Sequence, residues 1–535
     1  MDCDLMIVGA GGSGLVAAVK AKDLGVKNVL VLETGRNPGG STWYAGWSAG
    51  GYTKWQKEAG YPDTRDDSFR RTMKQYNWTR NPKLIRNYVD YAGPFFDWLN
   101  DLCDVSDFIE KPTPYVKPQG NQQGGGPGGM GGDMGGDMGE QGGGGGPGAM
   151  GNQKARLTIS QTSFILNKKS RDPSIGPGRG GTYLVKRLLE QCEKKGVKIL
   201  LETRAREFIK DSKGNVTGAY ADGKDGRVQV NFKACVLAAG GLTRNREKLK
   251  KVWPQWFDND NTLHVFSCLG SVGDSFDMAG QIGALIDYSK MSLEFGGPVH
   301  HPYSFTIYKM PEYFPQCVFV NLNGERFFSE TDLKWIAQYA LVEQPKGECY
   351  CIFDDDMVEA GPDIFIKNNP EEAWPFENNG LRKDIEYEIS LDEAGVPGNR
   401  TKKADTFEEL AKKMNVPADK FVGTMKRYNE YCETGVDLEM YKKAKYLKPI
   451  KKPPFYAFWQ QNFANTTHNG LVINENMELI NARTKKGIAN IFAAGDNAQA
   501  MEGGMQWCPV SGYMAGIAAA KCLGIGPGLI DMRNA

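Results

Sequence analysis

The chain has 535 residues and a mass of 59.1 kDa, which is enough for two or three domains of roughly 100 to 200 residues each. Its 65 basic and 64 acidic residues give a formal net charge of +1, so no broad positive field favours nucleic acid as a partner. The 11 cysteines show no spacing typical of a zinc, haem or iron–sulfur site, and we expect reduced thiols and no metal.

The hydrophobic pattern argues against a membrane or secreted protein. No stretch reaches the roughly 18 apolar residues that a spanning helix needs, and the mean hydropathy is -0.47. Residues Met1 to Asp4 lead into an apolar strand without the basic and apolar regions of a signal peptide. We therefore expect a soluble, cytoplasmic protein.

The N-terminal segment has the order strand, glycine turn, helix, strand and acidic residue. The apolar run Leu5 to Val8 enters a glycine-rich turn, and a second run, Asn28 to Leu32, ends at Glu33. This order is typical of the opening of a Rossmann-like, doubly wound parallel sheet that binds a dinucleotide. We expect the strands Cys235 to Ala239 and Ile491 to Ala494 to join the same layer, so that both ends of the chain build one domain.

Each residue type in the turn has a physical role. Gly9 allows the tight turn, Gly11 lets backbone N–H groups approach a pyrophosphate, and Gly14 permits close packing of helix and strand. Glu33 stands where a carboxylate accepts hydrogen bonds from ribose hydroxyls and repels a 2′-phosphate. These residues alone leave NAD and FAD both possible.

The expected domains follow from composition. Residues 1–290 and 462–535 form the cofactor domain, and the aromatic, charged segment 291–461 forms an inserted capping domain with helices near Thr406 to Met414 and Phe421 to Cys432. Residues 119–152 are almost only Gly, Met, Asp, Gln and Pro, which predicts a mobile insertion, since such a composition buries little apolar surface.

Three further motifs decide the cofactor by resemblance, and a fourth, in the expected cap, fixes the family assignment. The stretches Gly39 to Gly46, Ala238 to Gly241, Ile491 to Asp496 and Asn323 to Glu330 resemble motifs of the fumarate reductase and succinate dehydrogenase flavoprotein superfamily. The resemblance implies an α/β, glutathione reductase-type FAD domain with an inserted α+β cap. Covalent members attach FAD through a histidine close to the position of Thr42, where this chain has none, so we expect non-covalent FAD. The predicted cofactor residues are Gly9, Gly11, Gly12, Ser13, Gly14, Glu33, Gly39, Gly40, Ser41, Thr42, Ala45, Gly46, Ala205, Ala239, Gly240, Asp274, Gly495, Asp496, Ser511 and Gly512.

The resemblance also points away from fumarate as the substrate. In fumarate reductases an arginine eight residues after the position of Arg326 delivers a proton, and here that position is Lys334, which could equally be a solvated lysine. Arg326 and Glu330 could form only a structural ion pair. The family's dicarboxylate clamp needs an arginine that the stretch Gly503 to Gly512 lacks, and an uncompensated buried carboxylate costs several kcal/mol.

Aromatic residues stand at several substrate positions of the family, although each could be ordinary core. They predict a flat, apolar substrate such as a steroid, bile acid or polyphenol. In the ketosteroid dehydrogenases of this superfamily tyrosines, rather than arginines, carry out the proton chemistry. The residues are Trp43, Tyr44, Trp47, Tyr303, Tyr308, Tyr313, Trp507 and Tyr513.

The sequence thus predicts hydride transfer from flavin N5 to a C=C bond that a carbonyl activates. The carbonyl oxygen would accept from amides near Gly503, Gly504 or Gly512, or from a tyrosine hydroxyl. Alternatives are desaturation in the direction of a 3-ketosteroid dehydrogenase, a flavoprotein subunit of a redox complex, and a flavoprotein without turnover. NADH, reduced flavin or a ferredoxin would be the diffusing electron donor. The candidate proton-transfer residues are Lys334, Tyr513, Tyr303, Arg326 and His301, which neighbours His300 on the opposite side of an expected strand.

Overall fold

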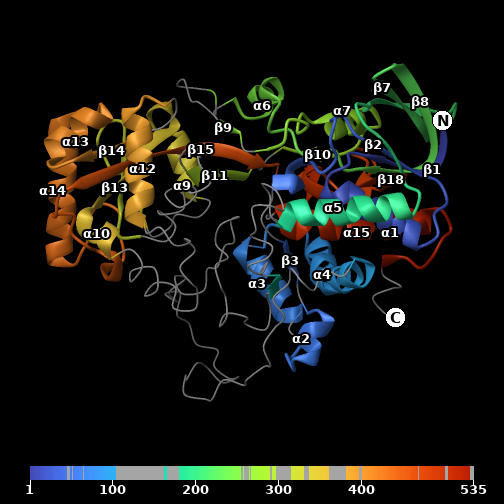
Figure 1. Ribbon diagram of the computed structural model, residues 1–535, viewed down its shortest axis with the longest axis horizontal. Helices are drawn as coiled ribbons and strands as arrows, with labels where there is room; N and C mark the ends of the chain where they lie inside the picture. The colour runs from blue at the N-terminus through green and yellow to red at the C-terminus, as the bar shows by residue number, and fades with distance from the viewer. Residues whose placement is uncertain are drawn as a thin grey trace.

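The computed structural model describes most of the chain in two adjoining bodies (Figure 1). The described residues are 1–44, 48–50, 52–63, 65–76, 78–103, 162–164, 180–254, 257, 264–265, 267–288, 292–296, 315–330, 336–360, 381–396, 400–467, 469–500 and 504–529. The insertion expected at 119–152 lies outside these residues.

The larger body contains an eight-stranded sheet whose main order is β17-β18-β8-β1-β2-β5, with β7 beside β8 and β6 beside β7. Strands β18, β8, β1, β2 and β5 run parallel, which confirms the Rossmann-like class. The bounds are β1 Asp2–Val8, β2 Val29–Leu32, β5 Lys198–Leu200, β6 Arg204–Lys210, β7 Val216–Gly223, β8 Gly226–Leu237, β17 Glu478–Ile480 and β18 Gly487–Ala493.

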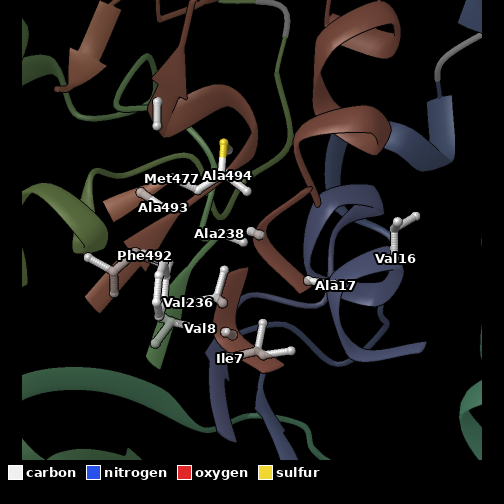
Figure 2. Packing of buried hydrophobic residues seen from close by; sticks show 14 of the residues in the cluster. Ile7, Val8, Val16, Ala17, Val236, Ala238, Met477, Phe492, Ala493 and Ala494 are labelled. Atoms are coloured by element: carbon white, nitrogen blue, oxygen red, sulfur yellow. The ribbon is translucent and has the colours of Figure 1, made fainter. Parts of the chain in front are cut away.

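Both ends of the chain meet in the centre of this sheet. Ile7 of β1 pairs with Val236 of β8, and Val236 pairs on its other side with Phe492 of β18. These side chains are at most 2% exposed, as expected for parallel strands that are covered on both faces. Figure 2 shows the three strands with their apolar side chains packed together. The expectation that distant segments form one layer is therefore confirmed.

Helices cover the sheet and place its glycine turns. Helix α1 (Gly12–Asp23) packs against both α5 (Gly180–Lys194) and α15 (Gly504–Cys522) (Figure 1). Helix α4 (Pro82–Cys103) packs on α15 in turn. The smaller elements of this body are η1 Gly40–Tyr44, β3 Ser48–Gly50, α2 Lys54–Glu58, α3 Arg65–Gln75, β4 Thr162–Phe164, α6 Arg246–Val252, α7 Asp274–Gln281, β10 Ile286–Asp287, β16 Asn469–Leu471, η9 Gly495–Asn497 and β19 Ala498–Gln499.

The second body is built on a six-stranded sheet of order β11-β15-β13-β12, in which β14 and β9 also pair with β15. The expected helices near 406–414 and 421–432 are present, and Thr406 caps the first by accepting from the Glu409 amide at 3.1 Å. The bounds are β9 His264–Val265, β11 Ser292–Gly296, β12 Val318–Asn321, α9 Ile336–Val342, η7 Pro345–Gly347, β13 Glu348–Asp354, α10 Asp355–Glu359, α12 Leu381–Glu393, β14 Thr401–Ala404, α13 Phe407–Met414, α14 Ala418–Thr434, η8 Ala444–Tyr446 and β15 Phe455–Thr466.

The two bodies have separate apolar cores. One core contains buried residues from Cys3 to Ala284 and from Ala464 to Leu529, together with Val342. The other core contains buried residues between Cys317 and Trp459. The boundaries expected at 291 and 461 stay predictions, because residues 289–291 and 297–314 are outside the described part of the chain. Within the described residues, every helix is too short or too polar to cross a bilayer.

Candidate active site

Two glycines of the first turn are required by the packing of the protein itself. Gly9 has a φ of +101°, and a Cβ there would lie 2.4 Å from the carbonyl oxygen of Ala238. A Cβ on Gly14 would lie 1.9 Å from the carbonyl oxygen of Gly9. A side chain at either position would therefore force strand, turn and helix apart.

Gly11 differs from these two because its missing side chain leaves open space. The nearest protein atom to a Cβ there would be the Gly39 carbonyl oxygen, at 4.0 Å. Gly11 caps α1, whose N-terminus offers backbone N–H groups and the positive end of the helix dipole. The turn thus forms a cradle that a Cβ would fill and that fits the pyrophosphate of FAD.

The Glu33 carboxylate lies at the edge of the same turn. Its Oε2 accepts from the Ala10 amide at 2.8 Å, and its Oε1 accepts from the Gly35 amide at 2.7 Å. The side chain therefore fixes the turns after β1 and β2 relative to each other. Each oxygen keeps a further lone pair for a ribose hydroxyl, so the geometry fits the role expected from its position.

The loop that contains η1 is fastened to the start of α1. The Gly12 amide donates to Thr42 Oγ1 at 3.1 Å, and the Gly39 amide donates to the Ala10 carbonyl at 2.8 Å. The Gly12 amide is thus committed to Thr42, and the amides that remain for a pyrophosphate lie elsewhere in the turn. Ala45 and Gly46, also expected at the cofactor, lie outside the described residues.

The C-terminal motif closes on α1 from the other side. Ser511 Oγ accepts from the Gly495 amide at 2.9 Å and donates to the Cys508 carbonyl at 2.8 Å. A Cβ on Gly495 would lie 2.4 Å from Ser13 Oγ, and one on Gly512 would lie 2.2 Å from the Ser13 carbonyl oxygen. These residues set the position of α15 on α1 and so shape the cofactor site through packing.

Thr467 is a residue of this site that the sequence analysis missed. Its amide donates to Asp496 Oδ1 at 3.1 Å, and its Oγ1 accepts from the Leu242 amide at 3.0 Å. A Cβ on Gly241 would lie 2.3 Å from Asp496 Oδ2. Asp496 therefore lies over the carboxyl end of β8. Thr467 is buried, and its partners Asp496 and Leu242 are distant in the chain, so no local motif marks it.

Four other expected cofactor residues lie on β6, directly after β8 and at the start of α7. Asp274 forms a double ion pair with Arg204, at 2.8 Å to Nε and 2.6 Å to Nη2, which joins α7 to β6. Its carboxylate is thus neutralised within the protein. Ala205 is buried beside Arg204, and the Ala239 amide donates to Ser275 Oγ at 3.3 Å. Gly240 follows with a φ of +76°.

The structure removes Tyr513 from the proton-transfer candidates. Its side chain is 4% exposed and packs on Trp98 and Phe95 at ring-centroid distances of 5.2 and 5.9 Å. Lys20 Nζ lies 4.6 Å from the ring centroid, and burial raises the pKa of the phenol. Trp507 is likewise core, fully buried with its Nε1 donating to the Ala498 carbonyl at 3.0 Å.

Arg326 belongs to a buried network of four charges in the cap. Its Nη2 lies 2.8 Å from both Glu330 Oε2 and Asp437 Oδ2, and Lys442 Nζ lies 3.5 Å from Glu330 Oε2. Burial acts to raise the pKa of both carboxyl groups, but their cationic partners outweigh it and hold both pKa values low. The side chains are at most 1% exposed, so Arg326 is a structural residue and not a proton donor.

The remaining proton-transfer candidates lie outside the described residues. They are Lys334, Tyr303 and His301. Of the aromatic residues expected near the flavin, Trp43 is half-buried against Gly39. The described geometry thus defines the proposed cofactor cradle in detail.

Sequence and structural comparisons agree with this cradle. The sequence model of the FAD binding domain family matches residues 4–511. Vinyl phenol reductase from Lactiplantibacillus plantarum is 25% identical over 515 residues, 94% of this chain and 90% of its own length. NADH:fumarate oxidoreductase from Klebsiella pneumoniae is 25% identical over 94% of this chain, which spans only 45% of that protein. A 3-ketosteroid-Δ4-(5α)-dehydrogenase from Rhodococcus jostii superposes with a TM-score of 0.65 and 21% identity over 97% of both chains.

Fold, cradle and comparisons define a flavin-dependent oxidoreductase that acts on CH–CH groups. The chain belongs to the FAD binding domain family within the fumarate reductase and succinate dehydrogenase flavoprotein superfamily. FAD is its cofactor, and strands from both ends of the chain lie together in the sheet that carries the glycine turn.

Proposed function

We propose that the protein reduces a carbonyl-activated C=C bond of a flat, apolar substrate such as a steroid, bile acid or polyphenol. FAD, bound without a covalent link, supplies the hydride from N5 to the β-carbon. The carbonyl is necessary because it passes the developing negative charge to an oxygen, which hydrogen-bond donors stabilise by about 3 kcal/mol each.

The observation that carries this proposal is the composition of the first half of α15. Residues 504–512 read Gly-Met-Gln-Trp-Cys-Pro-Val-Ser-Gly and contain no charged side chain. A dicarboxylate would bury its second carboxylate here without a cation, at a cost of several kcal/mol. An uncharged substrate avoids this cost, and the relative named a vinyl phenol reductase is consistent with an uncharged substrate.

Within the described residues, the N-terminus of α15 is the best place for the carbonyl oxygen. Gly504 is the first residue of this 19-residue helix, where backbone N–H groups and the helix dipole favour negative charge. Gly512 and Tyr513, the other expected donors, are buried in the packing against α1 and α4. The second proton comes from Lys334, with Tyr303 and His301 as alternatives.

The second candidate is the reverse reaction, desaturation of a ketone. The relative named 3-oxosteroid 1-dehydrogenase from Mycolicibacterium smegmatis, 25% identical over 524 residues, supports this candidate. The two directions differ in the partner of the flavin: reduction needs a donor such as NADH, reduced flavin or a ferredoxin, whereas desaturation needs an acceptor. The same catalytic geometry serves both directions.

Anaerobic absorbance of the bound flavin separates the two directions. We expect an enone to reoxidise the reduced flavin in the presence of protein, while the corresponding saturated ketone leaves oxidised flavin unchanged. Reduction of the flavin by the ketone alone would establish the desaturase instead. If neither compound changes the spectrum over a panel of steroids and phenolic enones, the proposal fails.

The proton donor is tested by Lys334→Ala and Lys334→Arg. Removing a general acid lowers turnover by about 100-fold or more, because the proton must then come from water. The arginine variant should recover part of this loss and shift the alkaline limit of the rate upward, because arginine stays protonated at higher pH. Unchanged turnover in Lys334→Ala would assign the proton to another residue.

A further inference from the structure

Helix α6 and the residue before its cap carry an unusual concentration of positive charge. Residues 244–251 contain five basic residues and one acidic residue, Glu247, in a chain whose overall net charge is +1. Arg244, Arg246, Lys250 and Lys251 are exposed, and we call these four residues the basic patch. Figure 1 shows α6 at the upper edge of the view, standing out from the larger body. The patch is therefore accessible to a large partner.

The basic patch is fixed to the body by two sets of contacts. Lys248, the fifth basic residue, donates to the Gly273 carbonyl at 2.9 Å and pairs with Asp277 at 2.7 Å. The Arg244 guanidinium donates to the Ser267 carbonyl at 3.0 and 2.6 Å. The patch is thus attached directly to the loop 267–273.

This loop lies against the cofactor cradle. The Cys268 amide donates to Ser41 Oγ at 3.1 Å, and a Cβ on Gly40 would lie 3.9 Å from Cys268 Sγ. A Cβ on Gly270 would lie 3.4 Å from the Thr34 side chain, next to Glu33. Between these contacts Leu269 is 83% exposed. An exposed apolar side chain therefore lies on the same loop that Arg244 contacts, next to the proposed FAD site.

We propose that the basic patch and Leu269 dock a small acidic electron-carrier protein of the ferredoxin type, which reduces the FAD. The inference rests on the proposed function, because a reductase needs an electron source. Two reduced carriers each lose one electron, and the FAD gains two electrons and one proton from water. Opposite charges steer such encounters and raise association rates by about 10- to 1,000-fold at low salt. Leu269 gives the contact an apolar centre with a charged rim.

The test compares two double variants that change charge equally. Lys250→Glu/Lys251→Glu reverses half of the basic patch, and Lys412→Glu/Lys426→Glu reverses two exposed lysines on α13 and α14 of the cap. Stopped-flow absorbance follows anaerobic FAD reduction by a reduced acidic 2[4Fe–4S] ferredoxin, by reduced methyl viologen and by NADH. In the patch variant we expect the second-order rate constant for reduction by ferredoxin to fall at least 10-fold and to lose most of its salt dependence. The rates with methyl viologen and NADH should stay unchanged. The cap variant should behave as the parent protein.

Leu269→Ser tests the apolar centre, since an 83% exposed side chain contributes little to folding. We expect slower reduction by ferredoxin with no change for methyl viologen. An unchanged ferredoxin rate in the patch variant, or a loss confined to NADH, would overturn the docking site. Reoxidation of the flavin by an enone is measured separately, so failure of that half-reaction would contradict the proposed function alone.

Discussion

Single glycines in the first turn serve two different purposes, and substitution separates them. Gly14 is needed by the protein, because a Cβ there would lie 1.9 Å from the Gly9 carbonyl oxygen. At Gly11 a Cβ meets no protein atom closer than 4.0 Å, and we propose that the ligand, and not the protein, requires this glycine. The proposed cradle is thus a place where the protein leaves room for a side chain, but where that side chain would collide with the bound cofactor.

We expect Gly11→Ala to weaken FAD binding by at least 10-fold while the stability of the apoprotein changes by no more than about 0.5 kcal/mol. The φ of Gly11 is -75°, which alanine adopts freely, so only the ligand meets the added methyl group. Gly14→Ala is the matched comparison and should cost about 3 kcal/mol or more even without FAD. Flavin fluorescence titration and urea unfolding of the apoproteins measure the two effects. Equal FAD affinity in Gly11→Ala would place the pyrophosphate elsewhere.

The buried network of Arg326, Glu330, Asp437 and Lys442 predicts a pH dependence. The folded pKa values of Glu330 and Asp437 lie below their ordinary values of 4.5 and 3.8. Their contribution to the free energy of unfolding is therefore complete above about pH 5 and is lost as the pH falls through the lower, folded values. Near neutral pH this contribution should be flat.

Glu330→Gln tests this dependence. It leaves a buried guanidinium and a buried ammonium short of one negative charge, which costs about 3 to 5 kcal/mol at pH 7. The variant should also lose stability less steeply than the parent below pH 4.5, because one carboxylate no longer titrates. Urea unfolding at pH 7, 5.5 and 4, followed by tryptophan fluorescence, gives both quantities. Identical acid slopes in the two proteins would contradict the role of Glu330.

At the scale of elements, the packing of α15 on α1 fixes the cofactor cradle. Gly512 and Gly516 lie one helical turn apart, and a Cβ on them would be 2.2 Å from the Ser13 carbonyl oxygen and 2.8 Å from the Ala17 carbonyl oxygen. Because backbone atoms provide both contacts, the helices must separate if either glycine gains a side chain. The turn at Ser13 would then move with them.

We expect Gly512→Ala to destabilise the protein by about 2 to 3 kcal/mol and to weaken FAD binding as well. Gly280→Ala in α7 is the control, because a Cβ there meets nothing within 4 Å, and alanine in a helix should stabilise by about 0.5 to 1 kcal/mol. Thermal unfolding with and without added FAD measures both variants. Full stability of Gly512→Ala would show that α15 can shift without cost.

The same elements show what the sequence could and could not predict. Gly14 could be identified as a packing glycine because the atom that it must avoid, the Gly9 carbonyl oxygen, is close to it in the chain, whereas Gly9 is constrained by Ala238, which only the fold brings next to it. Tyr513 was misplaced because α15 is apolar all round, so its sequence does not indicate which side faces the flavin. The partners Asp437 and Arg326 are 111 positions apart, and only the fold brings such a pair together.

At the scale of the whole molecule, the two apolar cores imply two partly independent folding units. Every described contact of the cofactor cradle comes from the core that joins the N- and C-terminal segments, whereas the charge network lies in the cap. A ligand that binds only the folded form stabilises the unit that contains its site. FAD should therefore act on one unit and the Glu330→Gln substitution on the other.

We expect calorimetry of the apoprotein to show two transitions, of which only one moves upward when FAD is added. At an FAD concentration 100 times the dissociation constant, the gain is about 2.7 kcal/mol for the unit that binds it. Glu330→Gln should lower the temperature of the transition that does not respond to FAD and leave the FAD-dependent shift intact. Gly11→Ala should reduce the FAD-dependent shift without moving the transition that does not respond to FAD. A single transition that responds to FAD and to both substitutions would mean that strand β15, which runs from the cap to the larger body, couples the two cores into one cooperative unit.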